Sequence, residues 1–352
     1  MKRYLKERKE KFLKSIEADL YISNSSETIK YLTDISGAGM LFIVEGKLYV
    51  IVDKLSYPAF SLLEAWIAQV IQSNDFAKVL KKIIDEKRIK SVSCQPEQMS
   101  FSIIQKIREN NVELISQPYL SENIRMIKDE LEIKKIKKAA IINRNSIMKT
   151  YPYIKPGVTE KEIASELEYQ MRKNGSDGLS FPTIVATKKN AYNPHAVPSD
   201  TKIADNDVVL IDFGATVDGY HADQSYTFIV GKADSGLKNR YNAVFLAQYD
   251  AIEAVRDGIE AAKIDEFARN RLKKENLSKY FIHGTGHGVG LAIHELPWIA
   301  PSSKQIIKPN MIFTVEPGVY FGDGLGIRQE VMVLAHKSEG EVLGFAPIVE
   351  VV

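Results

Sequence analysis

The sequence predicts an α+β protein in which a smaller α/β domain precedes a larger C-terminal domain. Short apolar runs alternate with helical patterns over about the first 120 residues. Amphipathic helices and a β-hairpin pattern follow, and the chain from Tyr280 onward is rich in strand-forming residues and glycines. These patterns assign residues 1–120 to the N-terminal α/β domain and residues 121–352 to the C-terminal domain.

The N-terminal domain is predicted to contain a mixed sheet with helices packed on it. Its expected elements, in chain order, are two strands in residues 41–52, helices in residues 60–72 and 76–88, and strands in residues 92–94 and 112–116 on either side of another helix. The sequence has no phosphate-binding loop and no G-x-G-x-x-G pattern. A packing, oligomerisation or gating role is therefore favoured for this domain.

Composition excludes several classes of partner. The chain has 352 residues, of which 45% are hydrophobic and 26% charged, and a net charge of +2 gives no argument for nucleic acid or an anionic membrane. The single cysteine, Cys94, excludes an internal disulfide and favours a reducing compartment. Residues 1–20 lack the apolar core of a secretory signal, and no apolar run reaches the ~18 residues that span a bilayer. We therefore expect a cytoplasmic protein.

The first elements expected in the C-terminal domain are two helices. One begins at about Glu130 and carries apolar residues on one face. The second begins with a capping box formed by Thr159 and Glu162, and Gly175 ends it. Two more helices are expected between the hairpin described next and Tyr280.

A β-hairpin is predicted in residues 208–230. Residues 208–213 form an apolar, β-branched run, and residues 220–230 alternate apolar and polar side chains. Asp218 and Gly219 between them suit a two-residue type I′ turn, which needs positive φ at both positions. With the turn there, Val217 faces Tyr220.

This register brings two aspartates to one face of the hairpin. Asp212 pairs with Ser225 and Gly214 with Asp223, so all four side chains lie on the same face. The Cβ atoms of Asp212 and Asp223 are then at most roughly 7 Å apart, within reach of one shared ion. A three-residue loop would separate the two aspartates, and two solvated carboxylates on a surface hairpin are the alternative.

Histidines concentrate in the same half of the chain. Five of the six lie between residues 195 and 294, and three lie within twelve positions in the stretch HGTGHGVGLAIHE. The alternating glycines rule out an ordinary helix, so His283 and His287 are not a helical pair. Glycines instead allow the backbone and a ligand to approach closely.

Two glutamates are predicted to lie opposite each other. Glu316 and Glu330 belong to strand-like runs in residues 312–321 and 326–334, and folding these runs about Asp323 pairs the two glutamates. Like charges directly across a ladder repel, so the pairing indicates a cation. The alternative is a different register in which both carboxylates are solvated.

Four carboxylates with one or more histidines indicate a metal site. Oxygen-rich sites suit Mn²⁺, Co²⁺ or Fe²⁺, and Zn²⁺ is also compatible. Four carboxylates exceed what one ion needs and match two ions that share bridging ligands.

These motifs resemble the metallopeptidase family of prolidase, aminopeptidase P and methionine aminopeptidase, whose fold is called pita-bread. The similar stretches occur in family order from about residue 125 to the end of the chain: IDFGA, an aspartate eleven residues on, HGTGHGVGL, IHELP, TVEPGVY and GIRQE. The R-x-E arrangement at Arg328 and Glu330 and the separate N-terminal domain resemble the proline-specific branch.

The resemblance implies a set of metal ligands and supporting residues. The implied ligands are Asp212, Asp223, His287, Glu316 and Glu330. Asp223 and Glu330 would bridge both ions, Asp212 would bind one ion, and His287 and Glu316 the other. Arg328 and Ser225 would support the carboxylates. Tyr226 stands where the family usually has arginine, which leaves the local salt-bridge pattern open.

The resemblance also implies the residues that act on substrate. His195 and His294 would contact the substrate and the tetrahedral intermediate, His283 would line the pocket, and Glu316 would take a proton from water. Spacing alone would allow His221 as a ligand, but the resemblance gives it no role.

The expected activity is hydrolysis of the Xaa-Pro bond at the N-terminus of short peptides, as in aminopeptidase P or prolidase. Two divalent ions would serve as cofactors, Mn²⁺ or Co²⁺ ahead of Zn²⁺ or Fe²⁺, in a homodimer. The alternatives are a non-catalytic peptide-binding member of the fold and an amidine hydrolase like creatinase.

The length of the substrate depends on a cation for the free carboxylate of a dipeptide. Arg328 is the only arginine near the motifs and is already committed to the metal carboxylates, whereas Lys188 and Lys189 offer only point charges. We therefore expect longer Xaa-Pro peptides to be cleaved at least as well as dipeptides.

Overall fold

The structure is a computed structural model that describes residues 1–322 and 324–346. The chain divides into two compact units, Met1–Arg125 and Met126–Val352. Among the described residues, no helix combines the length and the apolar character needed to cross a membrane.

The first unit is built on one mixed six-stranded sheet in the order β4-β3-β2-β1-β5-β6. Its strands are β1 (Leu20–Ser23), β2 (Met40–Val44), β3 (Lys47–Val52), β4 (Gln69–Gln72), β5 (Ser91–Cys94) and β6 (Glu113–Ser116). Its helices are α1 (Lys2–Ser15), α2 (Ser26–Thr33), α3 (Tyr57–Phe60), α4 (Phe76–Lys87), α5 (Phe101–Arg108) and α6 (Leu120–Arg125), with a 3₁₀ turn η1 (Pro96–Gln98). Pairing is antiparallel from β1 to β3 and parallel elsewhere, which confirms the predicted mixed α/β sheet.

Helices cover both faces of this sheet. Leu80 of α4 and Ile107 of α5 are buried in one core with Ile22 of β1. On the other face Phe12 of α1 contacts Tyr21 of β1 edge-on, with ring centroids 5.2 Å apart. Side chains of a strand alternate between faces, so residues 21 and 22 of β1 supply the two cores.

The helix predicted in residues 60–72 is wrong. Only Tyr57–Phe60 is helical, and Gln69–Gln72 forms edge strand β4, in which Val70 pairs in parallel with Val50 of β3. Leu62, which lies within the predicted helix, is 90% exposed. The sheet offers the backbone of these residues hydrogen-bond partners that an isolated helical pattern cannot reveal.

The second unit contains four long helices and thirteen strands among the described residues. Its helices are α7 (Glu130–Thr150), α8 (Glu160–Lys173), α9 (Ser235–Glu253) and α10 (Ala261–Lys274), with 3₁₀ turns η2 (Tyr151–Tyr153), η3 (Lys188–Tyr192) and η4 (Ser278–Tyr280). Its strands are β7 (Gly178–Leu179), β8 (Ile184–Thr187), β9 (Asp207–Phe213), β10 (Ala215–Val217), β11 (Tyr220–His221), β12 (Gln224–Val230), β13 (Gly286–Gly288), β14 (Glu295–Ile299), β15 (Ile312–Val315), β16 (Gly318–Phe321), β17 (Leu325–Arg328), β18 (Val331–Ala335) and β19 (Gly340–Leu343).

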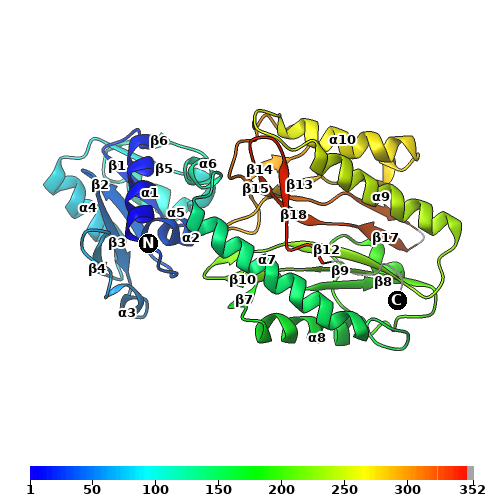
Figure 1. The fold of residues 1–352 in the computed structure, drawn as a ribbon. Coiled ribbons are helices and arrows are strands. Elements are labelled where there is room, and N and C mark those ends of the chain that lie inside the picture. The colour runs from blue at the N-terminus through cyan, green and yellow to red at the C-terminus, as the bar shows by residue number, and fades with distance from the viewer. Residues whose placement is uncertain (323, 347–352) are drawn as a thin grey trace. The chain divides into compact units, whose positions relative to one another are not determined.

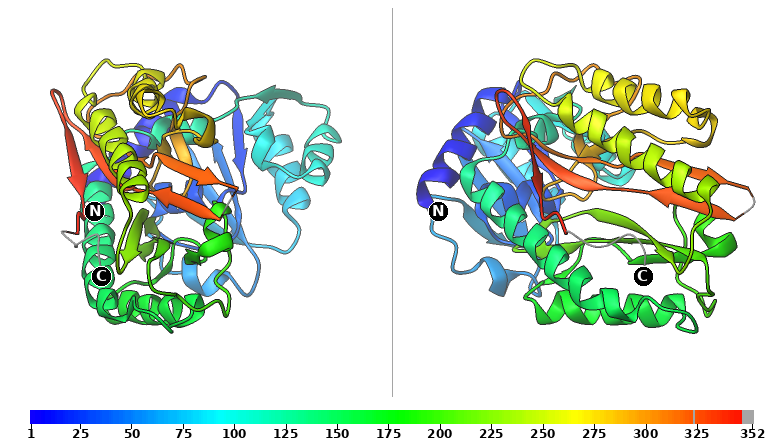
Figure 2. Two further views of the ribbon diagram at one scale, coloured as in Figure 1. Left: turned by 90° about the vertical axis from the view of Figure 1, so that its right-hand side faces the viewer. Right: turned by 45° about the vertical axis from the view of Figure 1, so that its right-hand side comes forward.

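Antiparallel sheets lie between two pairs of helices, as Figure 1 and the further views in Figure 2 show. The sheet orders are β12-β9-β8, β11-β10-β7, β14-β13-β15-β18-β19 and β16-β17. Helices α7 and α8 pack on each other on one side, and α9 and α10 on the other. The apolar faces of α9 and α10 share a core with Phe313 of β15 and Val333 of β18.

The helix starts follow their sequence signals. Thr159 and Glu162 form the predicted capping box at the start of α8. Asp129 and Glu132 form a second one at the start of α7. Each box satisfies backbone N–H groups that have no partner within the helix.

The predicted hairpin register is confirmed. Val217 pairs with Tyr220, and Asp212 pairs with Ser225. The turn residues have positive φ, 49° at Asp218 and 79° at Gly219. The two-residue turn therefore fixes which side chains of β9 and β12 share a face.

Gly214 interrupts the first strand of the hairpin for a steric reason. A Cβ atom at this position would lie 2.1 Å from the carbonyl oxygen of Ala222 and 2.7 Å from Cβ of Ser180. Only glycine permits this approach, which brings the start of β12 and Asp223 next to β9.

The register around the two glutamates is also confirmed. Val315 pairs with Val331 and Gly318 with Arg328, so Glu316 and Glu330 fall at corresponding positions between the two ladders. The predicted continuous strands are wrong, because each run breaks at its glutamate and the halves join different sheets. Asp323, the predicted centre of the turn, lies outside the described residues.

Candidate metal centre

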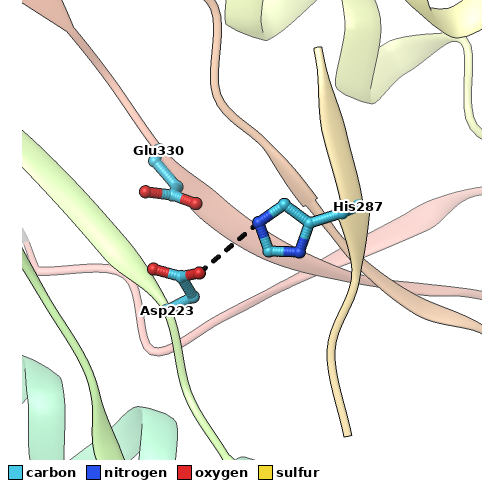
Figure 3. Close-up of side chains that lie close together, drawn as sticks. All are labelled: Asp223, His287 and Glu330. Carbon is cyan, nitrogen blue, oxygen red and sulfur yellow. Dashed lines mark ion pairs between the residues drawn. The ribbon is translucent and has the colours of Figure 1, made fainter. Parts of the chain in front are cut away.

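Three side chains in or next to different strands converge on one point. One ligand atom each of Asp223, His287 and Glu330 lies within 4.8 Å of the other two. Figure 3 shows the two carboxylates and the imidazole facing one another. All three residues are buried. Asp223 precedes β12, His287 lies in β13 and Glu330 precedes β18, so the site depends on the packing of separate sheets.

Glu316 extends this cluster through His287. Its Oε1 atom lies 3.4 Å from Nε2 of His287. The Thr314 hydroxyl donates a hydrogen bond to the same Oε1 atom at 3.2 Å and accepts one from the His287 backbone N–H at 3.1 Å. Thr314 therefore holds both residues, and the sequence analysis did not identify it.

The imidazole of His287 presents a lone pair to the carboxylates. Its Nδ1 atom lies 3.1 Å from the carbonyl oxygen of Gly288, which can only accept a hydrogen bond, so Nδ1 carries the proton. Nε2 then faces Asp223, whose Oδ2 atom is 3.6 Å away. Burial lowers the pKa of His287 to about 3. A neutral imidazole with this tautomer has the lone pair that a metal ligand needs and does not form an ion pair with the carboxylates.

Asp212 lies in the same cavity and is held by an arginine. Nη2 of Arg328 lies 2.6 Å from Oδ2 of Asp212. The Arg328 Nε–H donates to the Ser225 hydroxyl at 2.9 Å, and that hydroxyl donates to Oε2 of Glu330 at 2.7 Å. Arg328 and Ser225 thus join a carboxylate of one hairpin strand to a carboxylate of another sheet.

The same arginine contacts a residue that the sequence analysis missed. Nη1 of Arg328 donates to the Tyr320 hydroxyl at 2.6 Å, and that hydroxyl lies 3.1 Å from Nε2 of His283. The predicted register already placed Tyr320 diagonally across the ladder from Arg328. The register therefore indicated that Tyr320 could reach Arg328, but a tyrosine on a strand is more often only a packing residue.

The carboxylates are electrostatically unfavourable without a cation. Burial, followed by repulsion from Glu330, raises the pKa of Asp223 well above its usual range. Burial, followed by repulsion from Glu316, raises the pKa of Glu330 in the same way. Burial raises the pKa of Glu316 to about 8. A bound cation would reverse these shifts, because opposite charge favours the ionised form.

The donor set fits divalent metal ions. Asp212 lines the cavity, and its Oδ1 atom is buried and has no hydrogen-bond partner among the described residues, so a cation would satisfy this acceptor. Asp212 and Glu316 lie outside the group of three whose ligand atoms are all within 4.8 Å. Four carboxylates and a neutral imidazole spread in this way exceed the needs of a single ion.

A large cavity opens above the carboxylates. Its volume is about 1140 Å³, and Asp212, Asp223, His287, Glu316 and Glu330 all contribute to its lining. His195, His283 and His294 line it as well. The His294 ring meets the His287 ring edge-on at 4.2 Å between centroids. All eight predicted metal and substrate residues therefore border one space.

Polar residues near the sequence motifs differ in whether they reach this cavity. Nδ1 of His221 lies 3.1 Å from the Thr216 hydroxyl, and His221 does not line the cavity. Lys188 and Lys189 do not line it either. The cations in its described lining are Arg328 and the exposed Lys304, which the sequence analysis did not consider.

Tyr226, the departure from the family pattern, does not line the large cavity. It is buried, and its hydroxyl accepts a hydrogen bond of 3.2 Å from the Ala346 backbone N–H. The position therefore packs against a C-terminal segment and carries no charge.

Comparison with known proteins assigns both parts of the chain to described families. Residues 134–337 match the model of metallopeptidase family M24. Residues 7–127 match the creatinase/prolidase N-terminal domain. The first match spans more than half of the chain.

Relatives and solved structures agree with these assignments. An Xaa-Pro dipeptidase of Pyrococcus furiosus is 36% identical over 67% of this chain and 68% of its own length. The structure of an Xaa-Pro dipeptidase from Bacillus anthracis covers 99% of this chain and 100% of its own, at 30% identity and a TM-score of 0.94. That of an X-Pro aminopeptidase from Thermotoga maritima covers 97% and 99%, at 32% identity and a TM-score of 0.86.

Proposed function

The chain belongs to metallopeptidase family M24, and from this premise we propose that it hydrolyses the Xaa-Pro bond at the N-terminus of short peptides. The observation that carries the proposal is the buried group of Asp223, His287 and Glu330 at the floor of a cavity of about 1140 Å³. The relatives and solved structures described above act on Xaa-Pro substrates by name. The enzyme is a metallo-exopeptidase with the pita-bread fold.

We propose that two divalent ions bind here, Mn²⁺ or Co²⁺ ahead of Zn²⁺ or Fe²⁺. Asp223 and Glu330 would contact both ions, Asp212 one of them, and His287 and Glu316 the other. Two bound ions would supply Lewis acidity and a water of lowered pKa. The oxygen-rich donor set supports Mn²⁺ or Co²⁺.

The protein's own groups would then handle protons and orientation. Glu316, which lies 3.4 Å from His287, would take the proton from the attacking water. His294 and His195 border the cavity and would hold the substrate and the tetrahedral intermediate. Arg328 would keep Asp212 in place through its 2.6 Å contact.

We propose that longer Xaa-Pro peptides are cleaved at least as well as dipeptides. A cavity of about 1140 Å³ is larger than the roughly 300–1,000 Å³ of typical small-molecule sites. Trp298, which pairs with His287 across β13 and β14, is 44% exposed and gives the cavity an apolar wall beside the metal centre. Of the two cations in the described lining, Arg328 is already paired with Asp212, and Lys304 is exposed.

The test compares Ala-Pro with Ala-Pro-Ala under Mn²⁺ and under Co²⁺. We expect the tripeptide to have a kcat/KM at least equal to that of the dipeptide. Dipeptide turnover without detectable tripeptide turnover would contradict the proposed substrate length. Replacing Lys304 by Met would then show whether this lysine holds the dipeptide carboxylate.

Metal content tests the activity itself. Purified protein that holds no divalent metal and hydrolyses neither peptide with added Mn²⁺ or Co²⁺ would end the peptidase proposal. Peptide binding without turnover would instead support a non-catalytic member of the fold.

We also propose a homodimer in the cytoplasm. The single cysteine, Cys94, is buried and unpaired, which suits a reducing compartment. Light scattering after size exclusion tests the dimer, and cell fractionation tests the location.

A further inference from the structure

The loop that carries His294 is built around a buried carboxylate. Residues 289–294 connect β13 to β14, and Glu295 is the first residue of β14, opposite Gly288. His294 lines the cavity, whereas the side chain of Glu295 is only 2% exposed and does not line it. His294 directly precedes Glu295 in the chain, so fixing Glu295 also restricts where His294 can lie.

The backbone of this loop closes on the Glu295 carboxylate. The Ala292 N–H donates to Oε2 of Glu295 at 3.3 Å, and the Gly290 N–H donates to the Ala292 carbonyl at 3.1 Å. A Cβ atom at Gly290 would lie 2.3 Å from Oε1 of Glu295. Glycine at this position therefore allows the chain to pass directly over the carboxylate.

A buried lysine from another part of the unit neutralises this carboxylate. Nζ of Lys128 lies 2.9 Å from Oε1 of Glu295, and the two side chains are 1% and 2% exposed. Lys128 is itself fixed, because its backbone N–H donates to the Asn310 carbonyl at 3.0 Å and the adjacent Ile127 bridges to Met311. Segment 127–128 thus joins the His294 loop to the chain that enters β15.

Burial makes this ion pair a constraint on geometry. Water cannot replace Lys128 in this buried site, so removing it takes a cation away from the Glu295 carboxylate and raises the free-energy cost of keeping that charge in the interior. The loop must then shift to expose Glu295, and His294 would move with it. An exposed ion pair would impose no such requirement, because solvent screens its charges.

We propose that Lys128 and Glu295 are positioning residues that hold His294 against His287, where the two ring centroids are 4.2 Å apart. The inference rests on the proposed function, since it assigns His294 a role in the reaction. Neither Lys128 nor Glu295 lines the cavity, so neither is placed to touch substrate, and the proposed effect on His294 passes through the loop.

The first experiment is a double-mutant cycle on the metal-loaded protein. We expect Lys128→Met to lower kcat on Ala-Pro-Ala by about 10- to 100-fold, with KM and metal content within about twofold of wild type. In a His294→Ala background the same substitution should cause no further loss. Equal loss in both backgrounds would overturn the inference, because the effect would then not pass through His294.

The second experiment uses hydrogen exchange on the metal-free protein and needs no activity. The Ala292 amide should exchange at least about tenfold faster in K128M than in wild type, while amides of β9 and β12 keep their rates. An unchanged Ala292 rate would overturn the inference. If K128M does not fold, K128M/E295L removes both charges and the Ala292 acceptor together, and it must show the same faster exchange.

A matched control separates the buried pair from lysine loss in general. Lys137 pairs with Glu341 at 2.6 Å, and the two side chains are 38% and 39% exposed. Lys137→Met should leave kcat and Ala292 exchange unchanged. A loss like that of K128M would overturn the inference. The wild-type protein could hydrolyse no Xaa-Pro peptide while K128M still exchanged its Ala292 amide faster than wild type. That result would refute the proposed function and retain the loop constraint.

Discussion

Replacing Asp223 by Asn is expected to change stability in opposite directions with and without metal. The substitution keeps the side-chain volume and removes one of the crowded carboxylates. In chelator at pH 8 the variant should melt above wild type, because burial and repulsion from Glu330 already disfavour the charged Asp223. With Mn²⁺ it should melt below wild type, because it loses a ligand.

The magnitude follows from the geometry of the cluster. The ligand atoms of Asp223 and Glu330 lie within 4.8 Å. Two unit charges about 4.8 Å apart repel by about 3 kcal/mol at an effective dielectric constant of about 20. Charges closer than 4.8 Å would repel more, whereas proton uptake relieves part of the repulsion, so about 3 kcal/mol sets the order of magnitude. It corresponds to a gain of several degrees in the melting temperature of the metal-free variant.

Scanning calorimetry with EDTA and with excess Mn²⁺ measures both effects. At a free metal concentration of about 100 times Kd, wild-type protein should gain roughly 3 kcal/mol from one site, and the variant should lose most of that gain. Asp265→Asn is a matched control, because Asp265 is buried but pairs with Arg269 at 2.6 Å. The control should be destabilised equally in both conditions. The same pattern for Asp223→Asn would refute the reasoning and make Asp223 an ordinary structural partner.

Three further results are expected. The metal-free protein should lose stability between about pH 6.5 and pH 8, because burial raises the pKa of Glu316 to about 8 and the folded state therefore binds more protons there, whereas below about pH 6.5 the lowered pKa of His287 contributes in the opposite direction. Urea unfolding in chelator should show a fall on the order of a few kcal/mol, and a flat or rising profile would contradict this assignment. His294→Ala should keep its metal content and lose most of its kcat, whereas metal loss in step with activity would make His294 a ligand. Gly214→Ala should destabilise the protein by about 2 kcal/mol or more, since its Cβ would lie 2.1 Å from the Ala222 carbonyl oxygen, and unchanged denaturant midpoints would show that the strand can shift.

Local turn chemistry explains why the hairpin could be predicted from sequence. Asp218 and Gly219 adopt the two positive φ values that a type I′ turn requires. Once that turn is fixed, the period of two determines that Asp212 lies opposite Ser225. The position of these side chains therefore depends on fewer than twenty consecutive residues.

Contacts between distant segments could not be predicted in the same way. Residues 69–72 carry a pattern compatible with a helix, and only their pairing with β3 decides for a strand. The ion pair of Lys128 with Glu295 joins residues 167 positions apart. No sequence pattern near either residue predicts that the two side chains pair. A buried lysine is rare, so the sequence alone favours an exposed side chain at this position.

The breaks at the two glutamates show what separates the predicted site from the observed one. A continuous hairpin would have placed Glu316 and Glu330 directly across one ladder, where like charges repel. In the structure the register is kept, but one ladder ends before Glu316 and the other begins after it. The backbone N–H groups of both glutamates donate hydrogen bonds to other segments. The Glu316 N–H donates to the Thr285 carbonyl at 2.7 Å, and the Glu330 N–H donates to the Ser225 carbonyl at 3.0 Å. These bonds join the glutamates to the strands that carry His287 and Asp223. The interruption that sequence periodicity could not predict is therefore the feature that brings the carboxylates of separate sheets to one centre.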